Sequence, residues 1–102
     1  MLQMYFILFN IRSMKNIKYT DHAIKRCQSR GIPFPVVEFI VRNGKRINTH
    51  GDKKYFVTKK QMNSFKYEYK EIMRLYDKII RNTAVICNGN SIITAMKIIK
   101  RI

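Results

Sequence analysis

The sequence predicts an α+β domain in which helices come first and an antiparallel sheet of about four strands follows. Three observations predict this class. Two short helical patterns occupy the first part of the domain, and short apolar runs separated by turn signals come later. Between two of these runs, from about residue 60 to 81, apolar residues recur every three or four positions, which is typical of a long amphipathic helix inserted into the sheet.

Composition favours a folded, strongly basic protein. The chain has 102 residues, of which 46% are apolar and 12% aromatic, so one hydrophobic core is expected and a disordered chain is not. Twenty-one lysines and arginines against six acidic residues leave a net charge of +15. Such an excess favours a polyanionic partner, which means nucleic acid, an anionic membrane surface or an acidic protein.

The two cysteines, Cys27 and Cys87, have neither CxxC spacing nor clustered histidines around them. We therefore expect both to be reduced core residues, which fits a cytoplasmic location. His22 and His50 also lack the spacing of metal ligands, so no metal site and no cofactor are expected.

Residues 1–13 are expected to be an extension in front of a single domain of residues 14–102. The apolar run of residues 4–9 is far shorter than the ~20 residues that cross a bilayer, and the segment lacks the leading charge and cleavage site of a signal peptide. We expect no membrane insertion here, and an added edge strand at most.

The first helix is predicted over residues 21–30, after a short extended segment at residues 17–19. Thr20 or Asp21 can act as its N-cap, because the side-chain oxygen of either residue can accept a backbone N–H. Gly31 suits the left-handed position after the last turn, so the helix is predicted to end there.

This helix carries a cationic ridge. Successive helical residues rotate by about 100°, so positions four apart share one side of the helix. His22, Arg26 and Arg30 therefore lie along one ridge with Lys25 beside it, while Ala23 falls on the side that can pack against a core.

The remaining elements follow from turn signals and apolar runs. A second helix, mostly apolar and closed by Asn43-Gly44, is expected to be buried against the sheet. The Asn88-Gly89 pair predicts a type I′ turn between the last two strands. The second strand of the first hairpin, residues 53–59, is expected to be central or covered on both faces, and the closing strand to be interior. The predicted bounds are 35–43 for the helix and 45–49, 53–59, 83–87 and 91–101 for the strands.

The long predicted helix of residues 60–81 has a second stripe of charge. Lys66, Lys70, Arg74 and Lys78 follow one another at a strict spacing of four. This stripe is either an ordinary solvated face or a ridge that tracks a phosphate backbone.

The residues of the first helix carry a family resemblance. Residues 19–32 read Tyr-Thr-x-His-Ala-x-x-Arg-x-x-x-Arg-Gly-Ile, and an apolar helix ending in Asn-Gly-Lys follows. This pattern resembles a small bacterial family of domains of unknown function, whose members close with an apolar strand that carries a threonine, here Thr94. The similarity covers about residues 16–99. The family is similar in turn to the RelE-like and barnase–colicin-like ribonucleases of toxin systems, which place one or two helices before a four-stranded antiparallel sheet.

The resemblance implies metal-independent cleavage of RNA, in which the 2′-hydroxyl attacks the adjacent phosphate. That reaction needs a base near the hydroxyl, cations on the phosphate oxygens and an acid for the leaving oxygen. We assign His22 as the base and Arg26 and Arg30 as the phosphate clamp. Thr94 would hydrogen-bond His22 or the phosphate. The proton donor stays open between His50, Tyr55 and Lys54.

Further cations are expected to contact the nucleic acid without taking part in the chemistry. The partner would be RNA, free or on ribosomes, with an acidic antitoxin protein as inhibitor. The expected contacts are Lys25, Lys53, Lys54, Lys66, Lys70, Arg74 and Lys97.

Each of these residues also has an ordinary structural explanation. His22 can cap or pack the helix, Arg26 and Arg30 can pair with Asp21 or Glu38, and Thr94 and His50 can be plain strand and loop residues. Two other functions therefore stay open beside the nuclease, a non-catalytic nucleic-acid-binding module and an interaction domain for an acidic protein.

Overall fold

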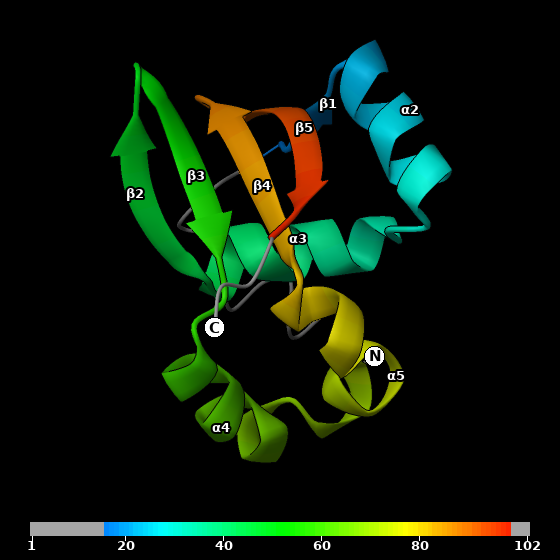
Figure 1. Ribbon diagram of the computed structural model, residues 1–102, viewed down its shortest axis with the longest axis vertical. Coiled ribbons are helices and arrows are strands. Elements are labelled where there is room, and N and C mark those ends of the chain that lie inside the picture. Colours follow the sequence, from blue (N-terminus) through cyan, green and yellow to red (C-terminus); the bar gives the residue numbers. More distant parts are fainter. Residues whose placement is uncertain (1–15, 99–102) are drawn as a thin grey trace.

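The computed structural model of the protein describes residues 16–98 and shows, within that range, four helices and one five-stranded sheet (Figure 1). The predicted α+β class is therefore confirmed. In chain order the elements are β1 (Lys18–Tyr19), α2 (Asp21–Arg30), α3 (Phe34–Asn43), β2 (Lys45–Thr49), β3 (Asp52–Phe56), α4 (Lys59–Glu68), α5 (Lys70–Arg81), β4 (Thr83–Asn88) and β5 (Ser91–Lys97).

The sheet has the strand order β1-β5-β4-β3-β2. Its four longer strands form the antiparallel array that the sequence predicts. The fifth strand, β1, is predicted only as an extended lead-in, and it pairs in parallel with β5 through Lys18 opposite Ser91 and Tyr19 opposite Ile92. Because β1 lies along the outer side of β5, the closing strand β5 is interior, as its apolar residues predict.

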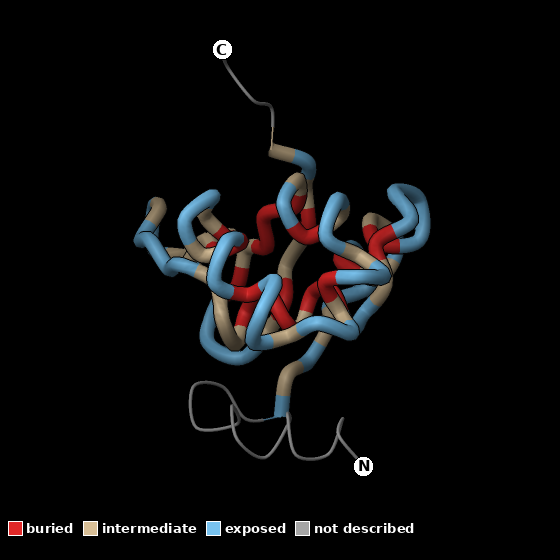
Figure 2. The backbone as a smooth tube through the Cα atoms, turned by 90° about the horizontal axis from the view of Figure 1, so that it is seen from below, coloured by how far each residue is buried: buried red, intermediate tan, exposed pale blue. Residues whose placement is uncertain are grey.

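The hydrophobic core lies between the sheet and α3. In Figure 1, α3 runs behind β3 and β4, and Figure 2 shows the buried backbone gathered in the centre of the domain. Val36, Val37 and Ile40 of α3 are fully buried in one cluster with Tyr55 and Val85 of the sheet. α3 is thus buried as its apolar sequence predicts, and it leaves the opposite face of the sheet for other roles.

The helices α4 and α5 lie beyond one end of the sheet and pack against α3 (Figure 1). Three aromatic rings make this junction. Phe39 of α3 meets Phe65 of α4 edge-on at 5.4 Å between ring centroids, and it meets Tyr69 at 5.1 Å. The Tyr69 hydroxyl also donates a hydrogen bond to the Asn43 side chain at 3.2 Å. The inserted helices are therefore joined to the core layer at the end of α3.

The prediction of one long helix over residues 60–81 is wrong. The backbone leaves helical geometry at Tyr69, with φ −126° and ψ 58°, so the segment forms two helices. A second departure, at Tyr76 with φ −133°, kinks α5. The turn at Tyr69 lets both Phe65 and Tyr69 pack against α3, which one straight helix would not do. The charged stripe at spacing four is accordingly not one continuous ridge.

The first helix, α2, has the ends that the sequence predicts. The Thr20 hydroxyl accepts a hydrogen bond from the Ala23 N–H at 3.1 Å, which satisfies one of the free donors of the first turn. Gly31 is left-handed, with φ 64°, and its N–H and that of Ile32 bond back to carbonyls of the last turn. The Thr20 hydroxyl also donates to the Ile93 carbonyl of β5 at 3.2 Å, so the cap fastens α2 to the sheet.

Replacing Thr20 with alanine should lower the free energy of unfolding by about 1–2 kcal/mol, because the variant loses both the helix cap and the hydrogen bond to β5. Urea unfolding followed by circular dichroism would measure the loss. Ser29→Ala is the matched control, since the Ser29 hydroxyl only donates to the exposed backbone of its own helix, and it should cost less than about 0.5 kcal/mol. Equal losses in the two variants would contradict this account of the cap.

Gly44 closes α3 by a different device from Gly31. Its backbone is extended, with φ −78° and ψ 173°, so no left-handed cap forms there. A Cβ atom at this position would lie 2.6 Å from the Ile40 carbonyl oxygen and 2.7 Å from the Phe56 carbonyl oxygen. Glycine is therefore required at residue 44 for close approach of α3 and β3 rather than for its backbone conformation.

The hairpins differ from the predictions in detail. β3 ends at Phe56 instead of residue 59, because Thr58 and Gln61 form a capping box that starts α4. The first hairpin turns at His50-Gly51, both with positive φ. In the last hairpin Asn88 stays in β4 and only Gly89 has positive φ, so the predicted type I′ turn at residues 88–89 is wrong.

Some predictions fall outside the described residues. These are the extension at residues 1–13 with its apolar run, and the end of the closing strand at residues 99–101. Within residues 16–98 the closing strand ends at Lys97, and no helix there has the length and apolar character that crossing a bilayer requires.

Candidate functional site

The cationic ridge of α2 is exposed along an otherwise well-anchored helix. Ala23 and Cys27 are buried in the core, and this fixes which side of α2 faces outward. His22 and Arg30 are exposed and Arg26 is half-buried, one helical turn apart from one another. The structure thus places the three residues on one side of α2, in the spacing that the sequence indicates.

His22 and Arg26 are in contact. The Arg26 Nε–H donates a hydrogen bond to His22 Nε2, with 3.4 Å between the nitrogens. In this contact Arg26 is the donor and His22 Nε2 the acceptor. An imidazole and a guanidinium therefore lie side by side at the surface, and a general base beside a bound phosphate needs these two side-chain types.

Among the described residues, Arg26 and Arg30 do not form the ion pairs with Asp21 or Glu38 that a structural role would give them. Within residues 16–98, neither Arg26 nor Arg30 lies within 4.0 Å of the carboxylate of Asp21 or Glu38. Glu38 instead accepts a hydrogen bond from the Tyr19 hydroxyl at 3.4 Å. Burial and the Glu38 carboxylate together raise the pKa of Tyr19, so this phenol keeps its proton. The guanidiniums of the ridge therefore remain available to an anion.

The register of the sheet defines a second surface, the outer face, which is the face turned away from α3. Side chains alternate between the two faces along each strand, and directly paired residues share a face. Tyr55, Val85 and Ala95 are paired neighbours on the core side. The outer face is therefore formed by the two adjacent rows Ile47–Lys54–Ile86–Thr94 and Lys45–Phe56–Ala84–Met96.

Thr94 lies on the outer face, next to a β-bulge and close to the start of α2. Thr94 pairs with Ile86 while Ile92 pairs with Cys87, so Ile93 is an extra residue in β5. The Ile93 carbonyl is the acceptor for Thr20, the N-cap of α2. This contact brings the first turn of α2 to the strand position next to Thr94. Among the described residues, no hydrogen bond joins the Thr94 and His22 side chains.

The expected nucleic-acid contacts in the sheet are divided between its faces. Lys54 shares the outer face and a row with Thr94, roughly 10 Å away across β4. Lys53 points to the other face, because it pairs with buried Cys87, and its ammonium donates to Asn48 at 2.6 Å. Lys97 pairs with buried Thr83 and also belongs to the α3 side of the sheet, where it is exposed. One RNA strand on the outer face would therefore contact Lys54 alone among these three lysines.

The expected phosphate ridge of the inserted helix is interrupted. Lys66 lies in the last turn of α4, Lys70 begins α5, and the non-helical Tyr69 separates the two helices. Arg74 forms an exposed ion pair with Glu71 at 3.2 Å. These cations are exposed and do not form a common line, whereas Lys25 is exposed on α2 beside the ridge, as predicted.

Two of the three proposed proton donors are badly placed. His50 is in the loop between β2 and β3, and β2 is the edge of the sheet opposite α2, three strand spacings or roughly 14 Å from β5. Tyr55 is buried on the core side, with 8% of its surface exposed. Lys54, half-buried on the outer face, is the remaining candidate.

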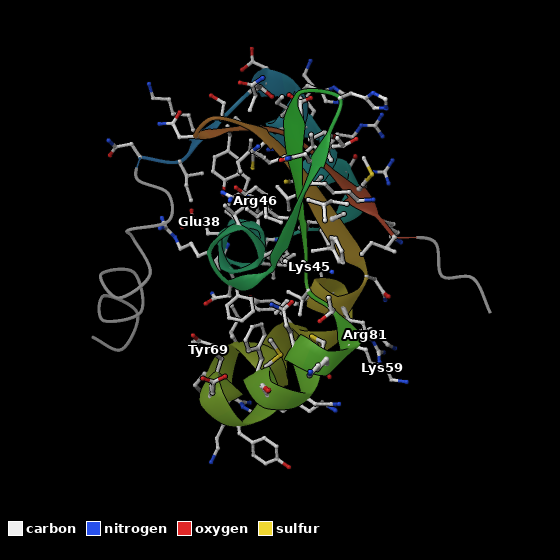
Figure 3. All side chains as sticks on the ribbon, turned by 90° about the vertical axis from the view of Figure 1, so that its left-hand side faces the viewer. Glu38, Lys45, Arg46, Lys59, Tyr69 and Arg81 are labelled. Atoms are coloured by element: carbon white, nitrogen blue, oxygen red, sulfur yellow. The ribbon has the colours of Figure 1, made fainter. Side chains whose placement is uncertain are left out.

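Sequence reasoning missed three cations, Lys45, Lys59 and Arg81, which the fold brings to one end of the outer face. Figure 3 shows Lys59 and Arg81 together on one side of the α4–α5 pair, with Lys45 above them. They are far apart in the sequence and share no local pattern. The signal that would have found Lys59 and Arg81 is the pairing of β3 with β4. Because α4 and α5 are inserted between these two paired strands, the first residues of α4 and the last residues of α5 lie at the same end of the strand pair.

The cysteines and acidic residues do not form a metal site. Cys27 and Cys87 are both free and buried. Burial raises the pKa of Cys27 and raises that of Cys87 to about 12, so both thiols are protonated at neutral pH. Within the described part of the chain, no three metal-ligating side chains come together.

No protein-family model, curated protein or solved structure matches the chain. The resemblance to toxin-type ribonucleases therefore stays a prediction from the residues of the first helix.

Proposed function

We propose that the protein is a toxin-type, metal-independent endoribonuclease of the cytoplasm. The observation that carries this proposal is the contact between the His22 imidazole and the Arg26 guanidinium on the outward side of α2. The net charge of +15 supports a polyanionic substrate, and RNA alone among nucleic acids carries the 2′-hydroxyl that such a site can use.

In the proposed reaction the Arg26 guanidinium turns from His22 Nε2 to the phosphate, and Nε2 then takes the proton of the 2′-hydroxyl. The freed oxygen attacks the adjacent phosphorus. Arg26 and Arg30 hold the phosphate oxygens as negative charge builds on them. The bond from phosphorus to the 5′-oxygen then breaks, and that oxygen receives a proton for which Lys54 is the best-placed donor. Thr94 hydrogen-bonds the phosphate from β5. The products are a 2′,3′-cyclic phosphate and a 5′-hydroxyl.

The same charge distribution suits an acidic inhibitor protein. An antitoxin with a carboxylate-rich segment would compete with RNA for the arginines of α2 and the lysines of the outer face. RNA on ribosomes is an equally suitable substrate, because the recognised groups are the same.

The first test is incubation of the purified protein with a mixed RNA pool in EDTA. We expect cleavage that leaves 2′,3′-cyclic phosphate ends. A chimeric oligonucleotide with one ribonucleotide in a DNA strand should be cut only after that ribonucleotide, because only there is a 2′-hydroxyl present. Intact RNA, both free and on ribosomes, would refute the nuclease proposal.

A second function, RNA binding without cleavage, is favoured by one observation. His22 lies on an exposed helical surface rather than in a cleft, and no second acid or base side chain touches it among residues 16–98. RNA retained in a gel shift but left intact would support this function. Tight binding of an acidic protein without any affinity for RNA would instead support an interaction domain.

A further inference from the structure

We infer that Lys45, Lys59 and Arg81 form a second phosphate-binding site, the insert patch, which holds single-stranded RNA away from the scissile phosphate. The inference rests on the proposed function for the identity of the ligand as RNA, and it does not require cleavage. With the insert patch, the inserted helices α4 and α5 form part of the surface that binds the RNA.

The strand register places the three cations at the same end of the sheet. Phe56 of β3 pairs with Ala84 of β4 and also with Lys45 of β2. Lys59 follows Phe56 by three residues, and Arg81 precedes Ala84 by three residues, so both leave the same end of the same strand pair. Figure 3 shows Lys59 and Arg81 on the same side of the helix pair, with Lys45 above them.

The three side chains are exposed, and none has a hydrogen-bond or carboxylate partner among the described residues. Lys59 opens the first turn of α4, which contains no acidic residue, and a cation is electrostatically disfavoured at a helix N-terminus. Arg81 adds a like charge on the same side of the helix pair (Figure 3). The repulsion between these positive charges and the helix N-terminus destabilises this part of the fold, and a bound polyanion would neutralise it.

The insert patch continues the outer face. Lys54 and Thr94 belong to one row of that face, and Lys45 and Phe56 belong to the next row, about 7 Å further along the strands. The half-buried Phe56 ring lies between the lysines of both rows, where a base can stack on it. An RNA strand that runs from Thr94 past Phe56 to the insert patch would therefore have to be single-stranded, so that its base is free to stack on the ring.

The chain offers a matched comparison on the same two helices. Lys66 and Lys70 are exposed cations of α4 and α5, but they flank Tyr69, which Figure 3 shows on the side of the helix pair opposite Lys59 and Arg81. Reversing either pair of charges changes the net charge of the protein by the same amount. A difference between the two variants therefore reports position and not total charge.

The experiment compares Lys59→Glu/Arg81→Glu with Lys66→Glu/Lys70→Glu. Fluorescence anisotropy would follow the binding of a labelled single-stranded RNA of about 16 nucleotides across a salt titration. In the insert-patch variant we expect the affinity to fall about tenfold or more, and the slope of log K against log salt to decrease by about 1.4, which is 0.7 for each lost phosphate contact. The control variant should change the slope by less than half of that.

Equal effects of the two variants, or no effect of either, would overturn the insert patch. If the charge reversals impair folding, Lys59→Gln/Arg81→Gln and Lys66→Gln/Lys70→Gln give the same comparison. Binding of polyglutamate but not RNA at these residues would also overturn it and assign the patch to an acidic protein. If only the insert-patch variant loses RNA affinity and the wild-type protein cleaves no RNA, the patch is supported and the nuclease proposal is refuted. If the wild-type protein cleaves RNA and both variants lose affinity equally, the nuclease proposal is supported and the patch is refuted.

Discussion

Replacing His22 with alanine should lower the single-turnover rate of RNA cleavage by about 10²–10⁴-fold, the usual contribution of a general base. RNA affinity should hardly change, because one imidazole adds little to a surface that binds phosphates through arginine and lysine. Stability should also be unchanged within about 0.5 kcal/mol, since His22 is exposed and Thr20 supplies the cap of α2. Quenched cleavage assays and anisotropy on the same RNA would measure rate and affinity separately.

His50→Ala is the control for this prediction. His50 is the other histidine of the chain, and the fold places it in the loop at the sheet edge opposite α2. Its replacement should leave the rate unchanged. Full activity of the His22→Ala variant would exclude His22 as the base, and a large loss in His50→Ala would show that the proton donor has been assigned to the wrong edge.

The parts of the fold that were predicted correctly depend on residues close together in the sequence. The cap at Thr20 and the left-handed Gly31 are local devices, and they set both ends of α2. The ridge of His22, Arg26 and Arg30 follows from those ends alone, because every member lies on the same helix. Helix-capping residues are enough to predict a site of this kind.

The break between α4 and α5 has no comparable signal. Tyr69 is neither glycine nor proline, and it continues the apolar period of residues 60–81 because it is packed against the core. The periodicity reports which residues are buried and not whether one straight helix buries them. The turn is decided by where Phe39 stands on α3, which is a tertiary contact.

The outer face was missed for a related reason. Whether Lys53 or Lys54 faces α3 depends on the pairing of β3 with β4, and a shift of one residue would exchange them. The grouping of Lys45, Lys59 and Arg81 depends on that same pairing together with the position of the insertion. A site made by strand register cannot be found by scanning for charged stripes along one element.

The inserted helices also allow a strong prediction about stability. Phe39 is fully buried and meets both Phe65 and Tyr69 edge-on, so it packs between α3 and the α4–α5 pair. Phe39→Ala should lower the free energy of unfolding by about 3–5 kcal/mol, through lost burial and the cavity left behind. That is a large part of the roughly 5–15 kcal/mol that holds a domain folded. Urea unfolding followed by circular dichroism and by tyrosine fluorescence would measure it.

Phe34→Ala is the matched control, because it makes the same chemical change in the same helix at a ring that is 40% exposed. Phe34 stacks on Tyr19 at 4.5 Å between ring centroids and meets no aromatic ring of the inserted helices, so its loss should cost no more than about 2 kcal/mol. In Phe39→Ala we also expect the insert patch to lose RNA affinity, because Lys59 and Arg81 are carried by the helices that this ring holds in place. Equal destabilisation by the two substitutions would mean that the inserted helices are held by contacts other than the Phe39 ring.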